Sequence, residues 1–184
     1  MKNPPSFLLL SFLTIVLTAC LPGGTTFSPE RAVTQELIQN HSAVLETIHI
    51  HQNQLWHGNK IFLVSFTSIE QNQKYGCEGV FELVPATISW RMSSSGIGCS
   101  SPPNTDPITY GSGTQGMAPD GYSYSYGLIT LSEAKWVLVT WDDGVDQRIP
   151  VINGSYLALR ENIIQTMPII QVFNEDEEVI NSRP

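Results

Sequence analysis

Basic residues are scarce in this chain of 184 residues. Lysine and arginine together number 9 against 17 aspartates and glutamates, which gives a formal net charge of −8 at pH 7. So acidic a surface repels phosphate backbones, and nucleic-acid binding is therefore not expected. It also repels anionic lipid head groups, so a basic patch is excluded as the means of holding the protein at a membrane.

Several signatures of chemistry are also missing. The sequence has no C-x-x-C pair and no G-x-S-x-G elbow, and no histidine follows His57. The letters Gly111-Ser112-Gly113-Thr114-Gln115-Gly116 match the dinucleotide fingerprint, which needs a strand before it and a helix after it. Here an irregular segment precedes the letters and Pro119 follows them. We therefore expect no nucleotide and no other cofactor.

One long apolar run is present, and it lies at the start of the chain. Residues 7–16 follow Lys2 and are too short to span the ~30 Å of bilayer hydrocarbon, which is typical of a signal peptide. The run leads into Leu17-Thr18-Ala19-Cys20, which resembles the lipobox of a bacterial lipoprotein. An ordinary secretory peptide that happens to contain a cysteine is the alternative.

The lipoprotein resemblance implies a division of the chain into three parts. Residues 1–19 would be the signal peptide, and residues 20–27 would be the lipidated Cys20 with a short tether. Residues 28–184 would form an extracytoplasmic domain held by the lipid at the cell membrane or outer membrane. The other two cysteines, Cys77 and Cys99, are then an even pair in a compartment where disulfides persist, so we expect them to be joined. Two unrelated buried thiols are the alternative.

The domain is expected to be mainly β, beginning with one helix. Ser28-Pro29-Glu30 is typical of a helix start, and Val33, Leu37 and Ile38 supply an apolar stripe before an end near Asn40. The pattern that follows predicts an antiparallel meander of about four strands. The signals are alternation around Ile48 and Ile50, a run over 61–66 that is apolar on both faces, a strand over 79–84 that ends before Pro85, and alternation at Ile88, Trp90 and Met92. Cys77 falls on one strand and Cys99 just past the end of another.

Strand patterns return at Tyr122, where tyrosines alternate with serines up to Tyr126. These tyrosines are expected to face the core, with an exposed stacking platform as the alternative. Further strands are predicted over 136–141, 149–152, 156–159, 169–173 and 179–180. The turn between the second and third contains Asn153-Gly154, which favours a type I′ hairpin.

Three stretches of this C-terminal third resemble a family of uncharacterised exported bacterial proteins. They are Tyr126-Gly127-Leu128-Ile129, the hairpin sequence Val137-Leu138-Val139-Thr140-Trp141-Asp142-Asp143-Gly144, and Pro150-Val151-Ile152-Asn153-Gly154-Ser155-Tyr156-Leu157. The resemblance implies a C-terminal half like a small β-sandwich and no activity. The family closes its last turn with glycine, whereas this chain has Glu177 at that place.

Residues 93–121 are rich in serine, glycine and proline and show almost no periodic apolar residues. This pattern predicts a long polar loop joining possible halves at 28–103 and 120–184. As a binding loop it would offer Tyr110 and Met117 as contact residues, since binding residues gather on loops carried by a rigid scaffold. A disordered spacer is the alternative.

Two polar clusters have the residue types of metal sites. His49 and His51 alternate on a strand, with His57 nearby in sequence, and could hold zinc or copper. A solvated strand face is the simpler interpretation. Asp142-Asp143-Gly144-Val145-Asp146 faintly resembles a calcium loop, but an Asp-Gly hairpin turn explains it equally well.

The sequence therefore predicts a lipid-anchored envelope protein, most simply a non-catalytic binding or structural module. Its partner would be the membrane, through Cys20, together with an unidentified envelope protein or ligand. The alternative is a metal-dependent or hydrolytic envelope enzyme built on His49, His51 and His57.

Overall fold

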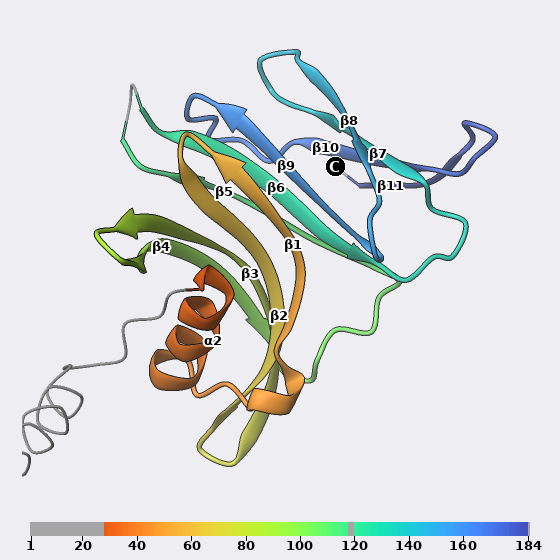
Figure 1. Cartoon of the computed structure of the whole chain (residues 1–184). Helices are drawn as coiled ribbons and strands as arrows, with labels where there is room; N and C mark the ends of the chain where they lie inside the picture. Colours follow the sequence, from red (N-terminus) through yellow and green to blue (C-terminus); the bar gives the residue numbers. More distant parts are fainter. Residues whose placement is uncertain (1–27, 118–119, 184) are drawn as a thin grey trace, which may run out of the picture.

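The computed structural model describes residues 28–117 and 120–183, which form one helix and three antiparallel sheets stacked in four layers (Figure 1). The signal peptide, Cys20 and the tether predicted over 20–27 lie outside the described residues. Within them, no helix is long and apolar enough to cross a membrane. A mainly β fold that opens with a helix is confirmed.

Helix α2 (Pro29–Asn40) begins as its sequence predicts. The Ser28 hydroxyl accepts a hydrogen bond from the backbone N–H of Arg31, and Pro29 occupies the first turn. Val33 and Leu37 are fully buried against the first sheet, whereas Ile38 is 41% exposed and does not belong to the apolar stripe. A 3₁₀ turn, η1 (Leu45–Thr47), links the helix to the first strand.

Sheet A is the predicted four-strand meander. Its strands, in spatial order, are β1 (His49–Trp56), β2 (Asn59–Glu70), β3 (Gln73–Ala86) and β4 (Ser89–Ser100). The central strand β2 is buried on both faces: Phe62 and Val64 pack towards the helix, and Ile61 and Leu63 pack towards the next sheet.

Strands β3 and β4 are longer than predicted. Strand β3 continues through Pro85. Its last residue paired with β2 is Leu83, two positions earlier, so at Pro85 the strand has only β4 as a neighbour and the missing N–H of proline breaks no pairing with β2. Ile88 lies in the exposed turn between β3 and β4. Cys99 lies within β4, directly opposite Cys77, and the two are joined by a disulfide with an S–S distance of 2.10 Å.

The long polar loop over 93–121 does not form. Strand β4 runs to Ser100, and a further strand occupies Ile108–Gln115. The strands of sheet B, in spatial order, are β5 (Ile108–Gln115), β6 (Tyr122–Ile129) and β9 (Ser155–Glu161). Strand β5 lacks an apolar period because Gly111 and Gly113 lie opposite Tyr126 and Tyr124, whose rings fill the space that other side chains would need.

The three tyrosines of β6 form the core between sheets A and B, as predicted. They pack with Leu157 and Leu159 against sheet A, and 5–6% of each tyrosine is exposed. The exposed stacking platform is therefore wrong. Ser123 and Ser125 are also buried, because a third sheet covers the other face of β6.

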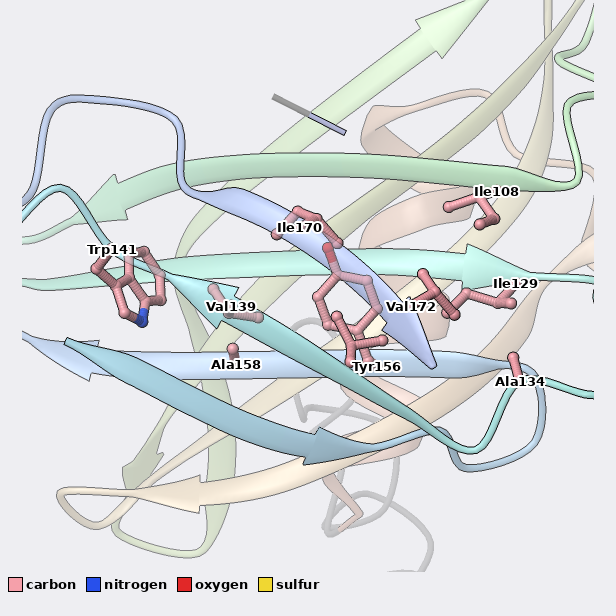
Figure 2. Packing of buried hydrophobic residues seen from close by; sticks show 10 residues of the cluster. Ile108, Ile129, Ala134, Val139, Trp141, Tyr156, Ala158, Ile170 and Val172 are labelled. Carbon is pink, nitrogen blue, oxygen red and sulfur yellow. The ribbon is translucent and has the colours of Figure 1, made fainter. Parts of the chain in front are cut away.

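Sheet C forms the last layer and packs on sheet B through a cluster centred on Trp141, Tyr156 and Ile170 (Figure 2). Its strands, in spatial order, are β11 (Val179–Arg183), β10 (Ile169–Phe173), β7 (Trp136–Thr140) and β8 (Asp146–Pro150). The Asn153-Gly154 turn has the two positive φ angles of a type I′ turn, but it closes only the single bridge between Ile152 and Ser155, because β8 and β9 belong to different sheets and do not form the predicted hairpin. The last hairpin closes without glycine, because Glu177 adopts a φ of 62°.

Candidate functional site

Sheets A and B form a sandwich whose two long sides are bridged. On one side, Gln52 and Gln54 of β1 donate hydrogen bonds to the backbone oxygens of Ser155 and Leu157 in β9. On the other side, β4 contacts β5. Each of the two remaining ends opens into a cleft, as the mouths of small barrels do.

One mouth, which we name the acidic pocket, has a volume of about 470 Å³. It lies where β1, β5 and β9 end and where β2 and β6 begin. Three carboxylates, three amides and two aromatic rings line it together with one histidine and two glycines, and no lysine or arginine is among its described lining residues. The lining consists of Trp56, His57, Asn59, Glu82, Gln115, Gly116, Asp120, Gly121, Tyr122, Glu161 and Asn162.

Glu82 is the buried carboxylate of the acidic pocket, with 8% of the residue exposed. Its Oε1 accepts a hydrogen bond from Asn59 Nδ2 at 2.7 Å, and its Oε2 accepts one from the Ser94 hydroxyl at 2.9 Å. Both donors are neutral, and Glu82 forms no salt bridge within residues 28–117 and 120–183. Each carboxylate oxygen keeps a further acceptor position, since an ionised carboxyl offers about four.

Tyr122 contributes a phenol that has no partner. The residue is 5% exposed, and its Oη is one of four buried side-chain polar atoms in the described chain that make no hydrogen bond. Burial, followed by the nearby Glu82 carboxylate, raises the pKa of Tyr122, so the group stays a neutral phenol. The ring centroid of Trp56 lies 6.1 Å from that of Tyr122.

The rim of the acidic pocket is exposed and carries the other charged groups. Nε2 of His57 lies 3.5 Å from Oε1 of Glu161, and both side chains are mostly in solvent. Asp120 lies in the connection between β5 and β6, two residues before β6 begins. Gly121 cannot carry a side chain there, because a Cβ would lie 2.7 Å from Ile163 and 2.9 Å from the Gln115 carbonyl oxygen. The rim is therefore acidic and its backbone closely packed.

The opposite mouth, which we name the disulfide cleft, has a volume of about 520 Å³ and is lined in part by Cys77 and Cys99. Across this cleft Thr109 Oγ1 donates to Glu78 at 2.6 Å, and the Oγ of Ser65, another lining residue, is hydrogen-bonded to His51 Nε2 at 2.7 Å. Burial raises the pKa of Glu78 and lowers that of His51.

The predicted histidine site is not assembled. His49 and His51 lie at the start of β1, with ring centroids 6.4 Å apart, and a bulge in the strand places His51 beside Ser65. His57 lies in the turn beyond the far end of β1, at the acidic pocket. No three histidine, cysteine or acidic side chains of the described chain lie together as metal ligands would.

The other sequence candidates also have definite places. Tyr110 packs partly buried against the cluster between sheets B and C, whereas Met117 is 86% exposed beside Gly116 of the acidic pocket. Asp143 accepts hydrogen bonds from the Val145 backbone N–H and from Arg160 Nε, so it serves the turn. The dinucleotide-like letters fall on β5 and its turn, away from any helix N-terminus.

Of the residues that line the acidic pocket, the sequence singled out only His57 as a candidate site residue, and it did so as a metal ligand. The pattern around Tyr122 indicated only a core position. The available signal was Glu82, a single acid inside the apolar strand sequence Gly79-Val80-Phe81-Glu82-Leu83-Val84. An acid at such a position is buried or faces a cavity, and a buried acid needs a partner.

Comparison with protein families, with curated proteins and with solved structures finds no match to this chain.

Proposed function

We propose that this chain is a lipid-anchored protein of the bacterial cell envelope, a non-catalytic binding module whose ligand occupies the acidic pocket. The lipobox-like sequence ending at Cys20 supports the anchor. The disulfide between Cys77 and Cys99 is consistent with an oxidising, extracytoplasmic compartment.

The unpartnered phenol of Tyr122 carries the assignment of the binding site. A buried hydroxyl without a hydrogen-bond partner costs roughly 1–3 kcal/mol. A ligand that hydrogen-bonds to this phenol recovers that free energy, and the pocket has the volume of a small-molecule site. The disulfide cleft is larger, but none of its described lining residues carries a buried polar side-chain atom without a hydrogen-bond partner. The acidic pocket is therefore the better site.

The test is a thermal-shift screen of the full-length protein in non-ionic detergent, with a panel of small amines, amino acids, sugars and carboxylic acids. A ligand at one hundred times its dissociation constant stabilises a protein by about 2.7 kcal/mol. We expect at least one solute to raise the melting temperature of the wild type and to lose most of its effect on Tyr122→Phe.

The matched control is Tyr110→Phe, which removes a phenol outside the acidic pocket. It should respond to the solute as the wild type does. A panel in which no solute stabilises the protein, or in which Tyr122→Phe responds like the wild type, would contradict the assignment of the pocket.

The alternative of an enzyme built on His49, His51 and His57 receives no support from the geometry. The first two residues lie at one mouth of the sandwich and the third lies at the other. No single substrate or metal ion can contact all three.

A further inference from the structure

We propose that the ligand of the acidic pocket is an aliphatic diamine or polyamine, with one ammonium group held at Glu82 and Tyr122 and another at the rim. This inference rests on the proposed binding function and specifies the chemistry of its ligand. Four features support it: the buried carboxylate of Glu82 without a cationic partner, the separate positions of the carboxylates, the aromatic walls of the acidic pocket, and the net negative charge of the chain.

The buried charge is that of Glu82. A buried carboxylate is normally paired with a cation, because taking it out of water without one is expensive. Asn59 and Ser94 give Glu82 two neutral hydrogen bonds and no positive charge. An ammonium group provides that charge, and its N–H groups can also bond to the lone pairs of the Tyr122 phenol oxygen.

The spread of the carboxylates favours an extended cation over a metal ion. Glu82 comes from the middle of β3, Asp120 precedes β6, and Glu161 ends β9. Within residues 28–117 and 120–183 these groups do not gather as the ligands of one ion. They instead offer one buried and two exposed anionic positions, which suits ammonium groups separated by methylene groups.

The aromatic walls suit the apolar part of such a molecule. Trp56 and Tyr122 lie with ring centroids 6.1 Å apart and both line the acidic pocket. Aromatic faces attract cations and also cover methylene groups. Since the whole chain has a formal charge of −8, its field also draws polycations towards this mouth.

Isothermal titration calorimetry of the full-length protein in non-ionic detergent tests this inference. The probes are spermidine, putrescine, the monoamine butylamine and the neutral isostere 1,4-butanediol. We expect one equivalent of spermidine or putrescine to bind, butylamine to bind more weakly, and butanediol not to bind. The affinity for the diamine should fall as salt is added, since the interaction is between charges.

Two variants separate the proposed contacts. Glu82→Gln should lower the affinity for every amine by about tenfold, because one charge-assisted hydrogen bond is lost. The Glu161 side chain is exposed, so Glu161→Gln should not affect folding. This variant should bind putrescine more weakly than the wild type and bind butylamine equally well. Glu46→Gln, which removes an exposed acid at the disulfide cleft, is the matched control and should bind every probe as the wild type does.

The possible failures are distinguishable. Binding of a neutral solute that depends on Tyr122, without binding of amines, would overturn the ligand class and leave the proposed function standing. Equal amine binding by the wild type, Glu82→Gln and Glu161→Gln would show charge attraction at no particular site and would overturn the inference. Displacement of spermidine by micromolar Ca²⁺ or Mg²⁺ would also overturn it, in favour of a metal site. If neither amines nor the wider panel bind, both proposals fail.

Discussion

Glu78 is the acid of the sandwich whose surroundings disfavour its charge. Its side chain accepts a hydrogen bond from Thr109, and its backbone oxygen accepts one from the Tyr126 phenol at 3.5 Å. Burial raises the pKa of Glu78, and the Thr109 hydroxyl opposes this effect only in part. The same burial, with Glu78 close by, raises the pKa of Tyr126. The neutral form of Glu78 is therefore favoured at this end of the sandwich.

The raised pKa of Glu78 makes the stability of the folded protein depend on pH. A folded-state pKa above the unfolded value of about 4.3 means that the folded protein binds the proton more tightly. The resulting stability is complete below that value and is lost as the pH rises through the folded pKa. We expect Glu78→Gln, which keeps an acceptor for Thr109, to raise the melting temperature at pH 7 and to change it little at pH 4.

Thermal unfolding followed by circular dichroism across this pH range measures the effect. Glu46→Gln, at an exposed position of the same cleft, is the control and should shift the melting temperature equally little at both pH values. A Glu78→Gln variant that is less stable than the wild type at pH 7 would show that the charged form is the favoured one.

At the scale of elements, local chemistry predicted the helix and the tight turns. The Ser28 cap and the positive φ angles of the Asn153-Gly154 turn are each decided by a few neighbouring residues, and both have the expected form. The strand run over 61–66 was also readable, because burial on both faces removes polar alternation. Such features need no information from distant parts of the chain.

Strand β5 and the end of β4 could not be read in this way. Gly96, Gly111 and Gly113 are glycines because tyrosine rings from β6 cover them, and this is a contact between strands. The serines and glycines of 93–121 are typical of a loop when only their own sequence is considered. The acidic pocket was hidden for the same reason: its residues come from six strands that meet only after the sandwich forms.

The packing of Tyr124 between β4 and β5 gives a test of this account. A Cβ at Gly96 would overlap the Tyr124 phenol oxygen but would lie 3.1 Å from its Cζ, whereas a Cβ at Gly113 would lie 2.6 Å from Cζ. Each alanine substitution should destabilise the fold by about 1–3 kcal/mol, as overpacking does. Adding Tyr124→Phe should rescue most of the loss at Gly96 and little of the loss at Gly113.

Urea unfolding of the single and double variants measures these couplings as double-mutant cycles. The Gly113 cycle serves as the control, since it involves the same tyrosine on the neighbouring strand. Equal rescue of both alanines, or no rescue at Gly96, would mean that the phenol oxygen does not set the spacing between sheet A and sheet B.

For the whole molecule, the order of the layers separates the proposed anchor from the proposed site. Helix α2 begins nine residues after Cys20 and packs on the face of sheet A that points away from sheet B (Figure 1). The acidic pocket opens at an end of the sandwich formed by the other face. A tether of 21–27, which reaches at most ~25 Å when extended, would therefore hold the protein near the bilayer by its helix side.

The proposed anchor depends on one thiol. Acylation of a cysteine at a lipobox needs the sulfur of Cys20, so Cys20→Ser should abolish labelling of the protein by a clickable fatty acid in cells. If the leader is still cleaved, the variant should also leave the membrane fraction. Stable attachment takes two acyl chains, or one chain with a basic patch, and the formal net charge of −8 does not favour a basic patch.

The control is the double variant Cys77→Ser with Cys99→Ser, which removes the disulfide and leaves Cys20 in place. It should be labelled and sediment with membranes as the wild type does, even where its stability is lower. Unlabelled wild-type protein would favour an ordinary secretory peptide, and labelled Cys20→Ser would place the lipid elsewhere. Because Tyr122 and Glu82 belong to the folded domain and not to the tether, the detergent-solubilised Cys20→Ser variant should still bind the amines that the wild type binds.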